Sequence, residues 1–233
     1  MLLIALAIAP GIAISLFIYS QRVYRGALLY LILSFVLGMA ATLPALALQL
    51  LAGDVRDDPT RHSLLAYAWY AFIVVGLSEE GVKFLVLRLY AFRQAAFRQP
   101  FDGILFAVLI GMGFATVENI EYVYQLGSGV GWSRAFLSVP AHGAFAVLMG
   151  YNVGWAKAVP ERSVFYMIRG LGIAVLFHGS FDFFIFLQQG HVAKGYVSDG
   201  LLSFGAFATF YIAVRMAMNA IRMHRKRNFD EEK

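Results

Sequence analysis

Residues 64–92 read LLAYAWYAFIVVGLSEEGVKFLVLRLYAF, an apolar run that is interrupted near its middle by Glu79, Glu80 and Lys83. About 20 mostly apolar residues are enough for a helix to cross the hydrocarbon core of a bilayer. Ionisable side chains at the centre of such a helix cost roughly 2.5–3.5 kcal/mol each. The stretch therefore predicts a membrane-spanning helix whose charges are retained for a function.

The whole chain is strongly apolar and carries few charges. Of 233 residues, 60% are hydrophobic and 14% are charged, whereas soluble domains have about 45–50% apolar and about 25% charged residues. This excludes an ordinary soluble domain and predicts an all-α fold, a polytopic transmembrane helix bundle. About seven spans are expected, at residues 2–19, 27–51, 64–92, 104–125, 135–156, 164–188 and 201–219.

Lys and Arg are distributed unequally between the two sides of these spans. One side receives Arg22, Arg25, Arg88, Arg93, Arg98, Lys157, Arg162, Arg169 and the basic residues of the tail. The other side receives Arg56, Arg61, Arg134 and Lys194. Because cytoplasmic loops are enriched in Lys and Arg, the N-terminus is expected outside and the C-terminus in the cytoplasm. The net charge of +5 then mostly reflects the basic cytoplasmic loops, so the lipid bilayer is an expected partner and no nucleic-acid partner is predicted.

No loop is long enough to fold separately, so the chain is divided by its helices. Residues 1–63 are expected to form two N-terminal transmembrane helices and an outer loop, and residues 64–188 a four-helix catalytic core. Residues 189–233 would form the last transmembrane helix and a basic cytoplasmic tail. The absence of cysteine excludes disulfides, thiolate metal ligands and thiol nucleophiles.

Ionisable and amide side chains also interrupt the fourth, fifth and sixth expected spans, with Glu118, Asn119, His142, His178 and Asp182. His178 and Asp182 are four residues apart and share a helix face, so the carboxylate can orient the imidazole. His142 lies about 12 Å from the outer end of its span at 1.5 Å per residue, and Glu118 and His178 lie at a similar depth. These groups are expected to meet in the outer half of the bilayer.

The charges of residues 64–92 follow the same helical spacing. Lys83 is four residues from Glu79 and three from Glu80, so one ammonium can contact both carboxylates. The same residue count places the two glutamates deeper in the membrane than His142.

Carboxylates, imidazoles and an amide at one depth suit the activation of water for hydrolysis. The histidines His142 and His178 with Glu118 are a possible Zn²⁺ site, because zinc accepts two histidines and one glutamate. The soluble HExxH spacing is absent, so catalysis by glutamate and histidine without a metal stays open.

Three short motifs in order give the chain a family resemblance: EExxK at residues 79–83, FxxxEN at 114–119 and HxxxD at 178–182. The chain resembles the PrsW family of bacterial intramembrane proteases, over roughly residues 64–188. The resemblance implies a peptide-hydrolysing enzyme of the bacterial plasma membrane, with Glu79, Glu80 and His178 as catalytic residues. It also implies a single-pass, membrane-anchored substrate similar to an anti-sigma factor. The supporting positions that it points to are Lys83, Glu118, Asn119, His142 and Asp182.

Two other functions use the same residues. Buried Glu, His and Lys also relay protons in ion-coupled transporters, and a non-enzymatic membrane binding protein can retain such motifs. The sequence leaves open which glutamate is the base, whether a metal takes part, which substrate is cleaved and which oligomer forms.

Overall fold

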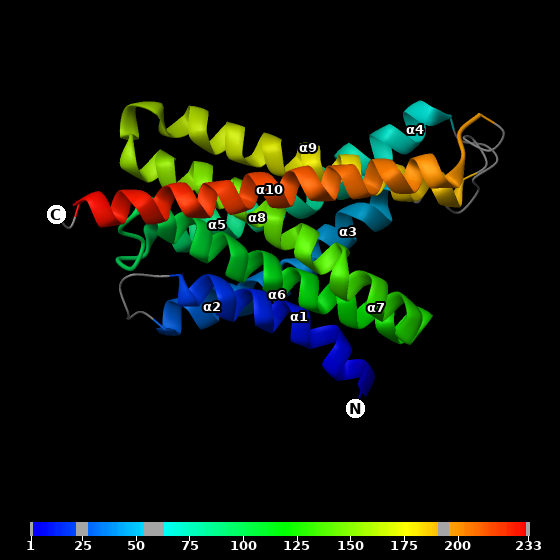
Figure 1. Cartoon of the computed structure of the whole chain (residues 1–233), viewed down its shortest axis with the longest axis horizontal. Coiled ribbons are helices and arrows are strands. Elements are labelled where there is room, and N and C mark those ends of the chain that lie inside the picture. The colour runs from blue at the N-terminus through cyan, green and yellow to red at the C-terminus, as the bar shows by residue number, and fades with distance from the viewer. Residues whose placement is uncertain (1, 22–27, 54–62, 191–195, 232–233) are drawn as a thin grey trace.

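The computed structural model describes residues 2–21, 28–53, 63–190 and 196–231, with side chains as far as residue 223 in the last helix. This part of the chain is helical apart from short connections and contains no strand. The helices run roughly along one long axis (Figure 1). They are α1 (Leu2–Ser20), α2 (Leu28–Ala40), α3 (Thr42–Ala52), α4 (Leu64–Trp69), the π-helix η1 (Tyr70–Leu77), α5 (Ser78–Leu89), the 3₁₀-helix η2 (Ala91–Arg93), α6 (Pro100–Leu126), α7 (Ser128–Phe136), α8 (Ser138–Ala158), the 3₁₀-helix η3 (Pro160–Arg162), α9 (Ser163–Gln189) and α10 (Asp199–Glu231).

The expected all-α membrane fold is confirmed. Six helical stretches in the described residues are long and apolar enough to cross a membrane: Leu3–Ser20, Leu28–Ala52, Pro100–Leu126, Ser128–Ala158, Pro160–Gln189 and Asp199–Met223. The remaining expected span, residues 64–92, consists of α4, η1 and α5, which follow one another without a break. Its middle is wound as a π-helix, which hydropathy does not reveal.

Two prolines explain where the helices depart from the expected spans. The expected span 27–51 is divided at Ala41, because Pro44 has no N–H for the carbonyl of Ala40. Similarly, Pro140 has no N–H for the carbonyl of Phe136, where α7 ends, and α8 begins two residues later. The helix α7 precedes the expected span 135–156 and was not predicted.

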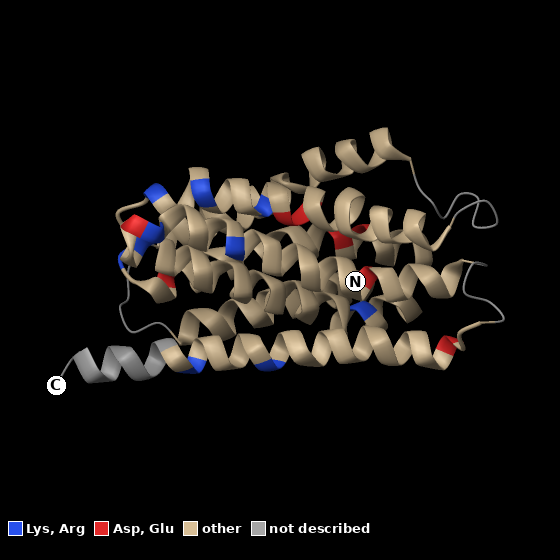
Figure 2. Ribbon diagram, turned by 90° about the horizontal axis from the view of Figure 1, so that it is seen from above, with Lys and Arg blue, Asp and Glu red and all other residues tan. Residues whose placement is uncertain are grey.

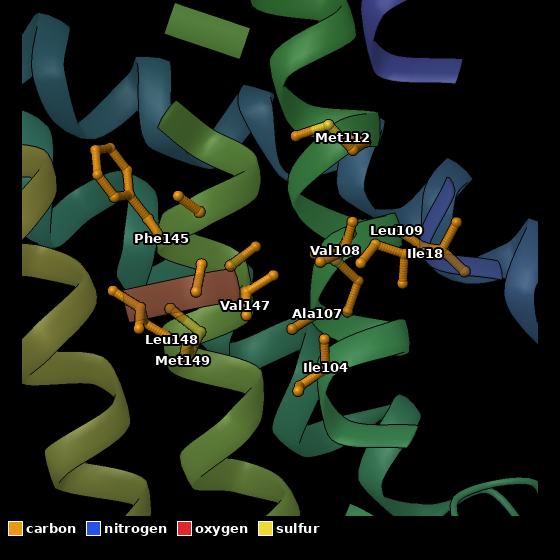
Figure 3. Packing of buried hydrophobic residues seen from close by; sticks show 14 of the residues in the cluster. Ile18, Ile104, Ala107, Val108, Leu109, Met112, Phe145, Val147, Leu148 and Met149 are labelled. Carbon is orange, nitrogen blue, oxygen red and sulfur yellow. The ribbon is translucent and has the colours of Figure 1, made fainter. Parts of the chain in front are cut away.

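The helices α6 and α8 form the centre of the bundle. Most of their residues are buried, and Figure 3 shows Ile104, Val108 and Met112 of α6 in one cluster with Leu148 and Met149 of α8. The backbones approach closely at glycines, since a Cβ on Gly150 would overlap the carbonyl oxygen of Gly103. Small residues at such contacts are typical of helix packing in membranes.

Gly150→Ala is expected to destabilise the protein by about 1–3 kcal/mol, because the added methyl group overpacks the contact with Gly103 and Ala107. The matched control is Gly172→Ala in α9, where an added Cβ meets no atom within 4 Å and helix propensity improves. Unfolding by SDS in mixed micelles measures both free energies. An unchanged stability for Gly150→Ala would contradict the close packing.

Most of the basic residues lie toward one end of the bundle. In Figure 2 most of the Lys and Arg residues lie in the half nearer the C-terminus. The connections between α5 and α6 and between α8 and α9 are at this end, and α7 lies at the opposite end (Figure 1). The expected grouping of basic connections on one side therefore holds for the described residues. The orientation of the two ends across the membrane stays a prediction.

Candidate active site

The acidic pair of the EExxK motif begins α5 directly after the π-helix. Glu79 and Glu80 lie in the first turn of α5, and they are 5% and 1% exposed. Lys83, 4% exposed, follows one turn later. π-Helical turns occur frequently at functional sites, and here the irregular winding ends where the buried charges begin.

Lys83 connects the acidic pair to a second helix. Its ammonium nitrogen is 3.2 Å from Oε2 of Glu79 and 2.9 Å from Oε1 of Glu80. The same nitrogen is 3.3 Å from Nδ1 of His142 on α8 and 3.9 Å from the centre of the Phe114 ring. The predicted contacts between the lysine and both glutamates are present.

His178 on α9 lies between carboxylates. Its Nδ1 is 2.8 Å from Oε1 of Glu80, and its Nε2 is 3.3 Å from Oδ2 of Asp182 and 3.9 Å from Oε2 of Glu79. The ring stacks on Phe145 at 5.4 Å between centroids. The expected pairing of His178 with Asp182 is present, and Glu80 adds a second carboxylate that fixes the ring.

His142 is oriented by groups of opposite charge. An ammonium can only donate hydrogen bonds, so the contact with Lys83 makes Nδ1 of His142 the acceptor. Its Nε2 then carries the proton and lies 2.9 Å from Oε2 of Glu118. The rings of His142 and His178 lie 5.0 Å apart and nearly perpendicular.

Several contacts of the site come from residues that the sequence did not single out. Gln49 of α3 donates from Nε2 to Oε1 of Glu79 at 3.2 Å. Arg134 of α7 forms an ion pair with Glu118, with 3.1 Å between Nη2 and Oε2. Asn119 accepts from Nε of Arg134 at 3.2 Å and donates from Nδ2 to the carbonyl oxygen of Ala7 at 3.0 Å. A lone glutamine near the end of an expected span and an arginine just before another are weak sequence signals.

These side chains face a cavity of about 630 Å³ among α3, α5, α6, α7, α8 and α9. Glu79, Glu118, His142, His178 and Asp182 line it. Glu80 does not, since its carboxylate lies behind Lys83 and His178. The two adjacent glutamates therefore have different surroundings, which the sequence alone could not distinguish.

Glu79, His142 and His178 each place one possible metal-ligand atom within 4.8 Å of the others. Two histidines and a glutamate are a ligand set of catalytic zinc. Glu80 and Glu118 contact the ring nitrogens of His178 and His142, as carboxylates around metal-bound histidines commonly do. The predicted set had Glu118 in place of Glu79, whereas here Glu118 pairs with Arg134.

The formal charge of the cluster also suits a divalent cation. Glu79, Glu80, Glu118 and Asp182 are opposed by Lys83 and Arg134, so the formal charge is −2 with neutral histidines and −1 when His178 carries a proton on each ring nitrogen. An excess charge in a buried site is costly unless it is compensated. The residues present therefore fit a divalent metal ion in both ligand type and charge.

Acid–base side chains that are buried among membrane-spanning helices and face a cavity suit an intramembrane enzyme. Residues 26–218 match the family described as PrsW family intramembrane metalloprotease. The chain belongs to the PrsW family of intramembrane proteases.

Relatives named Protease PrsW support this assignment. The protein of Shouchella clausii (strain KSM-K16) is 34% identical over 190 residues, which are 81% of this chain and 85% of the relative. The proteins of Clostridioides difficile (strain 630) and Bacillus subtilis (strain 168) are 34% and 30% identical, over 80% and 78% of this chain and 80% and 82% of theirs. No solved structure matches the chain significantly.

The expected protease activity and family are thereby confirmed, and the chain is a multi-pass bacterial membrane protein. The transporter and the non-enzymatic binding protein, which the residue pattern left open, are not supported by the comparisons. The individual roles of the site residues stay predictions.

Proposed function

We propose that the chain is an endopeptidase of the plasma membrane that cleaves a single-pass, membrane-anchored protein in the segment just outside the bilayer. Anti-sigma factors are membrane-anchored proteins of this kind. The observation that carries the proposal is the convergence of Glu79, His142 and His178 on one cavity.

The position of the cavity supports an outer site. It is lined by α7 and by the last turns of α6, which lie at the end opposite the basic end of the bundle (Figures 1 and 2). Because basic connections favour the cytoplasm, the cavity would face the outer half of the membrane.

The cavity also limits the shape of the substrate. At about 630 Å³, it has the size of pockets that hold drug-sized ligands. This volume suits a few residues of extended chain and is too small for a complete helix with its side chains. The proposed substrate segment is therefore extended where it is cut, as expected beside the end of a transmembrane helix.

In the proposed reaction Glu79 is the general base, because it is the glutamate of the pair that lines the cavity. The oxygen of a water molecule bonds to the carbonyl carbon of the substrate while one proton passes to Glu79. The same proton then passes to the amine nitrogen as the C–N bond breaks. His178, which lines the cavity, would stabilise the negative charge on the carbonyl oxygen, and Glu80 holds both His178 and Lys83 in place.

A metal ion fits the same residues. Glu79, His142 and His178 would hold it, and when bound it would polarise the carbonyl group and lower the pKa of water. In that case Glu79 would be a ligand of the ion instead of the free base, and Nδ1 of His142 would have to exchange its contact with Lys83 for one with the ion.

We expect about one zinc ion per chain in the purified protein by elemental analysis, and its loss after His178→Ala. We expect His142→Gln to lower the zinc content as well. The control, Arg169→Gln, should leave it unchanged. Active protein that contains no divalent metal would contradict this ligand assignment and would leave hydrolysis to Glu79 and the histidines alone.

The proposal is tested with the purified protein in liposomes together with a single-pass substrate that carries different tags at its two ends. Cleavage into two fragments, with no proton flux that depends on Glu79, is the expected result. A proton flux without cleavage would instead support a transporter. Retention of uncut substrate by the protein would support a binding protein.

A further inference from the structure

The helix α7 carries an arginine that contacts the FxxxEN motif from outside the catalytic helices. We propose that Arg134 is a positioning residue of the active site, which holds the Glu118 carboxylate beside Nε2 of His142 so that the imidazole keeps its orientation toward Lys83. This inference rests on the proposed hydrolysis at the Glu79, His142 and His178 site. It concerns a residue that lies outside the three motifs.

The guanidinium of Arg134 contacts both polar residues of the motif at once. Its Nη2 is 3.1 Å from Oε2 of Glu118, and its Nε donates to Oδ1 of Asn119 at 3.2 Å. The group also lies over the ring of Tyr122, with 4.0 Å between Cζ and the ring centre. A planar guanidinium can make these contacts in one orientation, whereas a lysine ammonium cannot.

The Glu118 carboxylate links Arg134 to the side chains of the proposed reaction site. Oε2 of Glu118, the oxygen that faces Arg134, is 2.9 Å from Nε2 of His142. Nδ1 of His142 in turn contacts the ammonium of Lys83 at 3.3 Å. Arg134 is thus linked to His142 through Glu118, and to the Glu79–Lys83 pair through Glu118 and His142.

Without Arg134, Glu118 loses the ion pair that holds its carboxylate beside His142. Its side chain is 19% exposed and lines the cavity, so the carboxylate is free to turn toward water in the cavity. His142 would then lose the carboxylate that orients its Nε2 side. The arginine prevents this movement, because Asn119 and Ala7 anchor the other side of its contact.

The same geometry argues against a direct role in binding substrate. The Arg134 side chain is 11% exposed, and its charge is already paired with Glu118. A residue that captures a substrate carboxylate needs an available cation. Arg134 therefore acts through Glu118 and not on the peptide.

The test compares Arg134→Gln, Arg134→Lys, Glu118→Gln and the double variant Arg134→Gln/Glu118→Gln, with Arg169→Gln on the exposed face of α9 as the control. Partners that orient catalytic or metal-bound histidines typically contribute about 10–100-fold. We expect Arg134→Gln to lower kcat by about this factor while KM stays within about twofold, and Arg134→Lys to restore only part of the loss. The double variant should be no slower than Glu118→Gln, because both changes interrupt the same contact.

A rise in KM with unchanged kcat would overturn the inference and make Arg134 a substrate-binding residue. Independent, multiplying losses in the double variant would overturn it as well. A readout that needs no cleavage is the ¹⁵N resonance of the His142 ring. It should shift in Arg134→Gln and not in Arg169→Gln, and an unchanged resonance would contradict the inference even if the protein cleaves no substrate tested.

Discussion

Glu79→Gln is expected to lower kcat for peptide cleavage by about 10²–10⁴-fold, the usual contribution of a general base. The substitution removes the basic carboxylate that lines the cavity but keeps the side-chain shape. Gln49 and Lys83 donate to different oxygens of Glu79 at 3.2 Å each, so the single amide oxygen of the variant can keep one of these two contacts. The measurement is the single-turnover cleavage rate of purified protein in liposomes.

The matched control is Glu161→Gln, an exposed glutamate of η3 at the basic end of the bundle. It should cleave at the wild-type rate, and Glu79→Gln should insert and purify in the same yield as the wild type. A Glu79→Gln protein that cleaves at the normal rate would exclude Glu79 as the base. If Glu80→Gln alone abolished cleavage, the two roles would have to be exchanged.

Lys83→Met is expected to destabilise the protein by about 3–5 kcal/mol, the cost of removing one partner of a buried ion pair. It leaves the buried carboxylates of Glu79 and Glu80 without the ammonium that contacts both. It also removes the donor to Nδ1 of His142. The free energy of unfolding in SDS-containing mixed micelles measures the loss.

The control for this change is Arg169→Met, which removes a cation from an exposed position of α9 and should alter stability by less than about 0.5 kcal/mol. Adding Glu80→Gln to Lys83→Met should recover part of the stability, because the carboxylate nearest the missing ammonium is then neutral. Full stability of Lys83→Met would mean that the acidic pair does not depend on this lysine.

The bundle was largely predictable because hydropathy and helical spacing are local properties. Runs of apolar residues located the spans, and intervals of three and four residues predicted that Lys83 contacts Glu79 and Glu80. Depth alone predicted that Glu118, His142 and His178 lie close together. The residue count placed the glutamates too deep, because it assumes straight helices of uniform winding, whereas the span contains the π-helix η1.

What the sequence missed depends on contacts between distant segments. Gln49 reaches Glu79 across 30 positions of the chain, and Arg134 was interpreted only as a charge that marks the outer side. The division at Ala41 and the helix α7 follow from Pro44 and Pro140, whose effects were visible in the sequence but were not used. The different surroundings of Glu79 and Glu80 arise from α9, through the contact of Glu80 with His178.

The central claim is that this site hydrolyses a membrane-anchored protein just outside the bilayer. Mass spectrometry of the two fragments from a tagged single-pass substrate, cleaved by the purified wild-type protein in liposomes, tests it most directly. The account predicts one cut within a few residues of the outer end of the substrate's transmembrane helix, and none with Glu79→Gln. A cut on the cytoplasmic side, or the same cut by Glu79→Gln, would contradict it.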